Sequence, residues 1–352
     1  MATIFNPFKT QNYLGAKKKN YFEGWYFRVA GEHPFSLIAG VSKNAHTPHS
    51  FIMFISPGLS HYFKFKTENF YFAKHNMAIN IAGNSLSLNR ININLNEPDI
   101  SVKADITLKN QTFFKKSFYC PSVMGPFGYF KMPCNHAVIL LKGNAAGNIA
   151  INQKQMQTDA LCYIEKDFGK NFPANYIWAH GIDKDFSIMF AYACPILQFR
   201  TKGPSPPCHC EPHPKAGLTK QSNHTPRHLR CHPSILEGNL GGKAKGLGAA
   251  HLCIVLYKNK QYNFSVYTLT KLNIQAAGQK QFAAKLKRGR NMLEFNITNK
   301  SPGSPLTAPA EGGRMETKIT ESLAARMVGT LKIHGKTINF DLPSAYEFVN
   351  KA

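Results

Sequence analysis

The sequence lacks the motifs of several large enzyme classes. It contains no G-x-G-x-x-G after a strand-like run, no P-loop, no G-x-S-x-G and no H-E-x-x-H. These motifs mark dinucleotide binding, phosphate binding, serine hydrolysis and zinc proteolysis. None of those activities is therefore indicated.

Long apolar runs are absent too. The stretch 1–15 has no apolar core of the kind that a secretion signal needs. The best apolar run, at 186–197, is broken by Pro195 and falls short of the roughly 20 residues of a membrane helix. The 8 cysteines lie mostly inside apolar segments, where we expect reduced thiols rather than disulfides. We therefore expect a cytoplasmic protein, soluble or peripheral at the inner face of a membrane.

Acidic residues are scarce beside basic ones. The chain has 43 Lys and Arg against 19 Asp and Glu, a formal net charge of +24, yet no run of five basic residues. The densest basic clusters, at 16–20 and 285–290, lie on no convincing amphipathic helix. Because no DNA- or RNA-binding motif accompanies the charge, it favours an anionic membrane surface over a specific nucleic-acid partner.

Tryptophan is rare, whereas phenylalanine and tyrosine are abundant. The counts of 2 Trp, 26 Phe and 14 Tyr are typical of half-buried pleated surfaces. Residues 78–108 alternate apolar and polar side chains, with turn residues at 83–84 and 96–99. Many short strand-like runs of this kind follow, and helical periodicity is nearly absent from the first half. They predict an all-β protein of two tandem antiparallel β-barrels, which we place at 1–155 and 156–352.

One segment, 201–248, does not fit this pattern. It is rich in Pro, Gly, His and Lys and has almost no apolar periodicity, so we expect a disordered insert in the second barrel. Its Cys and His residues between 208 and 232 match no standard zinc framework. We therefore predict no metal site there.

Two carboxylates flank a lysine in the strand-like stretch LCYIEKDFGKNFP. Because strand side chains alternate between faces, Glu165 and Asp167 share one face with Tyr163, and Lys166 and Phe168 share the other. If the first face is buried, desolvation and repulsion raise the pKa of at least one carboxyl, which becomes a proton donor near neutral pH. If that face is wet, the carboxylates are ordinary surface charges.

A second aromatic-rich stretch, NYFEGWYFRV, begins at residue 20. On a strand, Glu23, Trp25 and Phe27 face together, while Tyr26 and Arg28 face the other way. One face thereby sets an acid against an aromatic surface. The alternative is an edge strand with packed aromatics and a Glu–Arg pair on its rim.

Polar candidates also follow turns in two other places. Rigid turns at 125–126 and 132–133 place Asn135 and His136 at the start of a strand. His136 can bind a substrate hydroxyl or act as a base, or it can tie down the loop backbone. After a Gly-rich turn, Arg314 has an acid on either side, which suggests either a binding residue or an Arg–carboxylate latch.

Four segments in order resemble the tocopherol cyclase-like family: NYFEGWYFRV, MGPFGYFKMPCNHAV, CYIEKDFGKNFP followed by YIWAHG, and GRMETKITESLAA. The resemblance extends from about residue 18 to about 345 and fails only over 201–248. Each segment alone is a weak signal. Four of this length in the same order are specific.

The resemblance implies two tandem lipocalin-like β-barrels, related to those of carotenoid hydratase. Known members of the family cyclise a prenylated quinol to a chromanol: an acid protonates the alkene nearest the ring, and the phenolic oxygen captures the tertiary cation. This chemistry needs a carboxylic acid with a raised pKa, aromatic faces and a dry groove, but no metal or redox cofactor. The alternative is a non-catalytic carrier of a quinone, isoprenoid or other lipid.

The resemblance also implies roles for the candidate residues. The proton donor is Glu165 or Asp167, and His136 with Asn135 binds or deprotonates the phenol. Trp25, Tyr26, Phe168 and Trp178 form cation-stabilising walls, although Phe168 stands where the family commonly has Trp. The full set of substrate-binding candidates is Glu23, Trp25, Tyr26, Asn135, Lys166, Phe168, Trp178 and Arg314.

Overall fold

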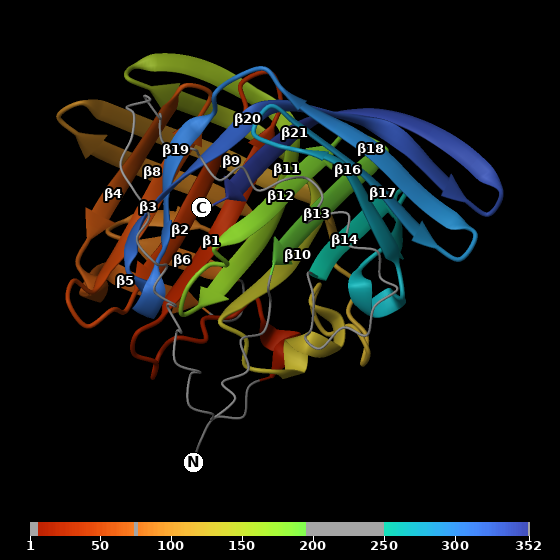
Figure 1. Ribbon diagram of the computed structural model, residues 1–352. Helices are drawn as coiled ribbons and strands as arrows, with labels where there is room; N and C mark the ends of the chain where they lie inside the picture. The colour runs from red at the N-terminus through yellow and green to blue at the C-terminus, as the bar shows by residue number, and fades with distance from the viewer. Residues whose placement is uncertain (1–5, 74–76, 195–249, 351–352) are drawn as a thin grey trace, which may run out of the picture. The chain divides into compact units, whose positions relative to one another are not determined.

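The computed structural model describes residues 6–73, 77–194 and 250–350. Their secondary structure consists of β-strands and short 3-10 turns in two antiparallel sheets, which belong to one compact unit (Figure 1). The all-β class with two barrel-type sheets in tandem is therefore as predicted. The predicted insert, 201–248, lies outside the described residues. No helix in the described part of the chain has the length and apolarity to cross a membrane.

The first sheet has 11 strands in the order β4-β3-β2-β1-β11-β10-β9-β8-β7-β6-β5. The strand that comes first along the chain, β1, pairs with the one that comes last, β11, which is the connectivity of an up-and-down barrel. Its strands and turns are η1 (Pro7–Lys9), β1 (Phe22–Ala30), β2 (Phe35–Ser42), β3 (His49–Ser56), β4 (Leu59–Phe65), η2 (Thr67–Asn69), β5 (Phe70–Ala73), β6 (Ala78–Ile81), β7 (Asn84–Leu86), β8 (Arg90–Glu97), β9 (Ile100–Phe113), η3 (Gly125–Tyr129), β10 (Cys134–Ile151) and β11 (Lys154–Gly169).

The second sheet has 10 strands in the order β15-β14-β13-β12-β21-β20-β18-β17-β16, and β19 pairs with β20 beside that path. It begins after β11, whereas the predicted division at 155–156 falls inside that strand. Its strands and turns are β12 (Asn175–Ile182), β13 (Phe186–Cys194), β14 (Ala250–Tyr257), β15 (Lys260–Asn263), η5 (Val266–Thr268), β16 (Lys271–Ala277), β17 (Gln281–Arg288), β18 (Asn291–Asn299), β19 (Ser304–Pro309), η6 (Glu311–Gly313), β20 (Met315–Ile333) and β21 (Lys336–Asn350).

Both sheets follow one plan. In each, the first strand of the half lies between the second and the last. Tyr26 of β1 is opposite Glu165 of β11 in the first sheet, and Trp178 of β12 is opposite Glu347 of β21 in the second. Glu165 and Glu347 therefore occupy equivalent positions in the two halves.

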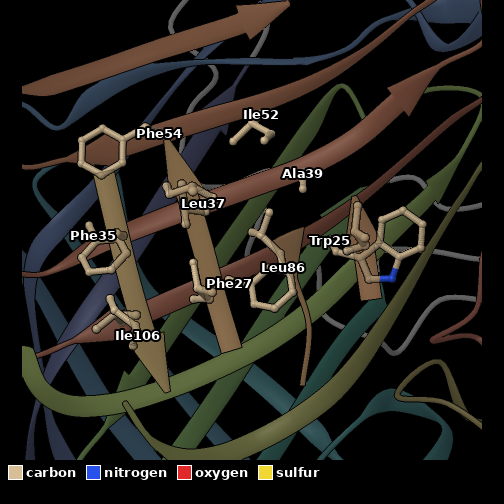
Figure 2. Packing of buried hydrophobic residues seen from close by; sticks show 14 of the residues in the cluster. Trp25, Phe27, Phe35, Leu37, Ala39, Ile52, Phe54, Leu86 and Ile106 are labelled. Atoms are coloured by element: carbon tan, nitrogen blue, oxygen red, sulfur yellow. The ribbon is translucent and has the colours of Figure 1, made fainter. Parts of the chain in front are cut away.

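Each sheet surrounds a hydrophobic core with its inward side chains. Along β8, Ile91, Ile93 and Leu95 are buried while the residues between them are exposed, so the alternation predicted for 78–108 is confirmed there. Figure 2 shows Phe27, Leu37 and other inward residues of the first sheet converging on this core. The second core is built in the same way from β12 to β18, β20 and β21.

A third group of buried residues joins the two sheets through their outward faces. The Tyr26 ring of β1 packs edge-to-face on Trp178 of β12, with centroids 5.4 Å apart. Tyr163 of β11 stacks on His180 of β12 at 3.7 Å. The first and last strands of each half thus carry one face into a core and the other into the interface between the sheets.

Candidate functional site

Strand alternation sends Glu165 and Asp167 of β11 into the interface between the sheets. Tyr163, two residues before Glu165, belongs to the apolar cluster of that interface. Phe168 packs instead with Tyr21 on the opposite face. The sharing of faces expected from the sequence is therefore what the structure shows.

Glu165 is a buried acid between the two sheets, with 4 % of its surface exposed. Tyr163 Oη and Trp178 Nε1 donate hydrogen bonds to its Oε2, at 2.5 and 3.2 Å. Burial raises its pKa to about 7, assisted by the Asp167 charge and opposed by His136 and the two hydrogen bonds. Near neutral pH a substantial fraction of Glu165 is therefore protonated.

His136, at the start of β10, lies between two carboxylates. Its Nδ1 is 2.9 Å from Asp167 Oδ1, and its Nε2 is 3.4 Å from Glu165 Oε2. Burial lowers the pKa of His136, but the two carboxylates outweigh burial and raise the pKa to about 9. At neutral pH His136 is therefore an imidazolium, which can donate a proton but must lose one before it acts as a base.

Two acids of the second sheet, Glu321 and Glu347, complete the cluster. They are neighbours across β20 and β21. Tyr26 Oη donates a hydrogen bond to Glu321 Oε1 at 2.5 Å, and Tyr176 Oη donates one to Glu347 Oε2 at 2.7 Å. Burial raises the pKa of Glu321 to about 7 and the pKa of Glu347 well above its usual range, where Glu321 adds repulsion. The sequence candidates include neither acid, although Glu321 lies within the segment GRMETKITESLAA.

Arg28 and His180 form the basic side of the interface. Arg28 Nη1 is 2.7 Å from His180 Nδ1 and donates to the His180 carbonyl at 3.0 Å. Because arginine can only donate, His180 Nδ1 accepts, and Nε2 carries the proton that is donated to Ser187 Oγ at 3.0 Å. Burial and then the Arg28 charge lower the pKa of His180 well below its usual range, so this ring is neutral.

Acids outnumber cations in this interface. The cations beside these acids are Arg28 and His136. Because an uncompensated negative charge is costly when buried, the carboxyl groups retain protons instead. The interface therefore holds protonated carboxyls at neutral pH. We use the term acid cluster for the side chains of Glu165, Asp167, Glu321 and Glu347.

Several buried polar atoms around the acid cluster have no hydrogen-bond partner within the described residues. They are Arg28 Nε, His136 Nε2 and Glu321 Oε2. Buried polar groups in folded proteins almost always have a partner. These three atoms therefore have capacity for a further hydrogen bond.

Four of the predicted binding residues lie elsewhere. Glu23 and Lys166 form an ion pair, fully buried on the inward face of the first sheet. Lys166 Nζ is 4.6 Å from the Trp25 ring centroid and 4.8 Å from that of Phe168. Trp25 and Phe168 thus cannot be walls for Glu165, because the strands that carry them turn these rings to the opposite face. Tyr26 and Trp178 do face the acid cluster.

The two remaining candidates make local contacts. Asn135 is buried, and its Nδ2 donates a hydrogen bond to the carbonyl of Met132 at 3.4 Å. Arg314 is partly exposed, with its Nε 3.0 Å from Glu316 Oε1. Asn135 thus stabilises the loop before β10, and Arg314 forms a local ion pair.

Three side chains of the site also have a spacing that suits a metal ion. His136, Glu165 and Asp167 each place a ligand atom within 4.8 Å of the other two. An imidazole with two carboxylates is a donor set that divalent first-row metals bind.

Stability should fall as pH rises through neutrality. The pKa of Glu165 and of Glu321 is about 7 in the folded protein against 4.5, so the folded state holds extra protons. Their contribution is fully present below pH 4.5 and is lost as pH rises through 7, on the order of 3 kcal/mol for each carboxyl. The raised pKa of His136 acts in the same direction up to pH 9.

Urea denaturation from pH 5 to pH 8 measures this loss. The substitution Glu321→Gln should flatten the slope and make the protein more stable than wild type at pH 8. The matched substitution Glu294→Gln, at a more exposed strand position, should leave the slope unchanged. A wild-type protein that gains stability over this range contradicts the assignment of buried, protonated acids.

Comparison with known proteins identifies the fold. No protein-family model and no curated protein match the sequence. The crystal structure of CghA with Sch210972 covers 94 % of this chain and 88 % of its own, with a TM-score of 0.55 and 8 % identity. A candidate AttH from Nitrosomonas europaea covers 94 % of this chain and 93 % of its own, with a TM-score of 0.47 and 9 % identity. The chain therefore shares the all-β, lipocalin-like fold of CghA.

Proposed function

We propose that the protein is a cyclase of the tocopherol cyclase-like type. It would protonate a prenylated quinol or a similar isoprenoid at Glu165 and close it to a chromanol. One observation carries the proposal: a carboxyl with 4 % of its surface exposed and a pKa of about 7 lies against the indole of Trp178. The resemblance of four ordered sequence segments to that family supports it, and so does the fold shared with CghA.

The reaction begins with proton transfer from Glu165 to the alkene carbon nearer the aromatic ring. The neighbouring carbon becomes a tertiary cation, which the faces of Trp178 and Tyr26 stabilise. The phenolic oxygen attacks this cation and forms the C–O bond of the new ring. Its proton passes to the Glu165 carboxylate, so the acid is regenerated. The product is an isomer of the substrate, and no electrons are exchanged.

Glu165 is a better donor candidate than Asp167. Asp167 is less buried, with 24 % of its side chain exposed, and it holds His136 Nδ1 at 2.9 Å. Since Glu165 Oε2 already accepts from Tyr163 and Trp178, the acidic proton resides on Oε1. Asp167 and His136 are instead suited to bind the phenol by hydrogen bonds.

The surroundings suit a hydrophobic quinol. Phe22, Phe172 and Tyr176 form a chain of edge-to-face rings, with centroids 5.4 and 5.9 Å apart, beside the apolar cluster of the interface. These rings provide apolar contact for an isoprenoid tail. A quinol has two hydroxyls, which can supply partners to polar atoms such as Arg28 Nε and His136 Nε2.

The direct test is turnover in deuterated water. Incubation with a prenylated quinol should give a chromanol with one deuterium on the carbon next to the new C–O bond, detected by mass spectrometry and NMR. A chromanol without deuterium would contradict proton-initiated cyclisation. Tight binding of several prenyl quinols without turnover would instead support the alternative of a carrier.

A further inference from the structure

Exposed aromatic side chains gather where η1 meets the loop that contains η3. Phe118, Tyr119 and Phe130 are 70 %, 78 % and 62 % exposed. The Tyr129 ring contacts those of Phe8 and Phe118, with centroids 6.5 and 6.1 Å apart, and the red and yellow segments lie side by side in Figure 1. We call Phe8, Phe118, Tyr119, Tyr129 and Phe130 the aromatic patch.

This clustering is unusual for the surface of a soluble protein. Phenylalanine and tyrosine are normally buried on at least one side, and contiguous apolar surface generally marks a binding site. The other exposed large hydrophobic residues are spread over different elements of the described structure: Tyr71, Phe113, Leu269 and Val328.

The rings are held in exposed positions by the backbone around them. Tyr129 Oη donates a hydrogen bond to the Phe118 carbonyl at 2.7 Å, and Lys116 Nζ donates one to the Phe8 carbonyl at 2.6 Å. Tyr267 of η5 supports the loop from behind by donating to the Val123 carbonyl at 2.9 Å. The loop is thus fixed to both halves of the protein, and its aromatic surface is a built feature.

The chain segments that carry the aromatic patch have charge of one sign. Residues 1–22 and 106–158 contain no Asp or Glu. Three exposed lysines lie close to the aromatic residues in sequence: Lys9 follows Phe8, Lys115 precedes Phe118, and Lys131 follows Phe130. The surface is therefore apolar and aromatic in its middle and positive at its border.

We propose that the aromatic patch docks the protein on an anionic lipid bilayer. Tyrosine and other aromatic rings are favoured at the level of the lipid headgroups, and lysines beside them are attracted to anionic headgroups. Together they supply the buried apolar area and the electrostatic attraction that set the strength of binding at a membrane interface. The same loop continues directly into β10 and His136, so a substrate taken from the bilayer would enter near the acid cluster.

Sedimentation with vesicles tests the proposal on the full-length protein. Wild type should bind phosphatidylcholine vesicles that contain phosphatidylserine and should release from them at high salt, because the attraction is partly electrostatic. The triple variant Phe118→Ser, Tyr119→Ser, Phe130→Ser should bind at least about tenfold more weakly. The variant Lys9→Gln, Lys115→Gln, Lys131→Gln should lose roughly a hundredfold at low salt.

Matched variants separate the patch from general surface properties. Tyr71→Ser removes an aromatic ring of similar exposure on β5, and Lys103→Gln with Lys154→Gln and Lys336→Gln removes equal charge elsewhere. Both controls should bind more tightly than the patch variants. Equal binding to neutral vesicles, or patch variants that bind like wild type, would overturn the proposal. The proposal would also be overturned if wild type does not bind vesicles and forms a dimer in analytical ultracentrifugation, while the aromatic variant is a monomer.

Discussion

Replacing Glu165 with glutamine should lower the rate of chromanol formation by at least about a thousandfold and leave quinol binding intact. The amide keeps an oxygen that accepts from Tyr163 and Trp178, so the packing between the sheets is preserved. It has no proton of useful acidity to transfer to an alkene. Single-turnover assays measure the rate, and quenching of tryptophan fluorescence measures binding.

Two further substitutions identify the donor. Glu321→Gln should retain most activity, because Glu321 is tied to Tyr26 on the other side of the interface. If Glu321→Gln removes activity and Glu165→Gln does not, the assignment of the donor is wrong. Asp167→Asn should move the alkaline limb of the pH profile to lower pH, because the Asp167 charge helps to raise the pKa of Glu165.

The pH profile of the wild-type reaction follows from the same acid. The protonated form of Glu165 is required, and its pKa is about 7. Above pH 7 the rate should therefore fall about tenfold per pH unit, the slope expected when one proton is lost. A rate that rises through this range indicates a general base instead.

The strands were predictable because their side chains alternate. Residues 90–97 gave a clear period of two. In β11 it was strand geometry, not a visible pattern, that set Glu165 and Asp167 apart from Lys166. The division between the halves was harder to place. β11 begins just before 155 and continues well past it, and composition does not change there.

The acid cluster was only partly predictable. Glu165, Asp167 and His136 lie on neighbouring strands of one sheet, whereas Glu321 and Glu347 meet them only when the second sheet packs on the first. The packing depends on how the outward faces of two separate sheets fit together. The alternation of residues within a single strand does not predict that fit. Strand alternation alone placed Trp25 on the face of Glu23 and Phe168 on the face of Lys166, away from Glu165. The resemblance implied that both rings stabilise a cation formed at Glu165, and this role conflicts with that geometry.

Breaking the ion pair of Glu23 and Lys166 should be strongly destabilising. Both side chains are fully buried, and Lys166 Nζ also donates to the carbonyls of Thr10 and Asn12, at 2.8 and 2.6 Å. The substitution Lys166→Met leaves the Glu23 carboxylate without its cation, which should lower the free energy of unfolding by about 3–5 kcal/mol. Urea denaturation measures the loss.

The surface provides a matched control. Lys285 and Glu294 also form a cross-strand ion pair, at 2.9 Å, with 40 % and 35 % of their side chains exposed. Lys285→Met should cost less than about 1 kcal/mol, because water already solvates both partners. Equal losses at the two sites would show that Lys166 contributes no more than a surface pair.

A second substitution distinguishes a buried charge from lost packing. Adding Glu23→Gln to Lys166→Met removes the uncompensated carboxylate and should restore part of the lost stability, with an interaction energy of about 1–3 kcal/mol in the double-mutant cycle. The segment at Thr10–Leu14 should nevertheless exchange its amide hydrogens faster, because its carbonyls have lost the Lys166 ammonium and the Leu14 amide has lost the charged Glu23 acceptor. The pair therefore links the core of the first sheet to the N-terminal segment, next to the turn that carries Phe8 into the aromatic patch.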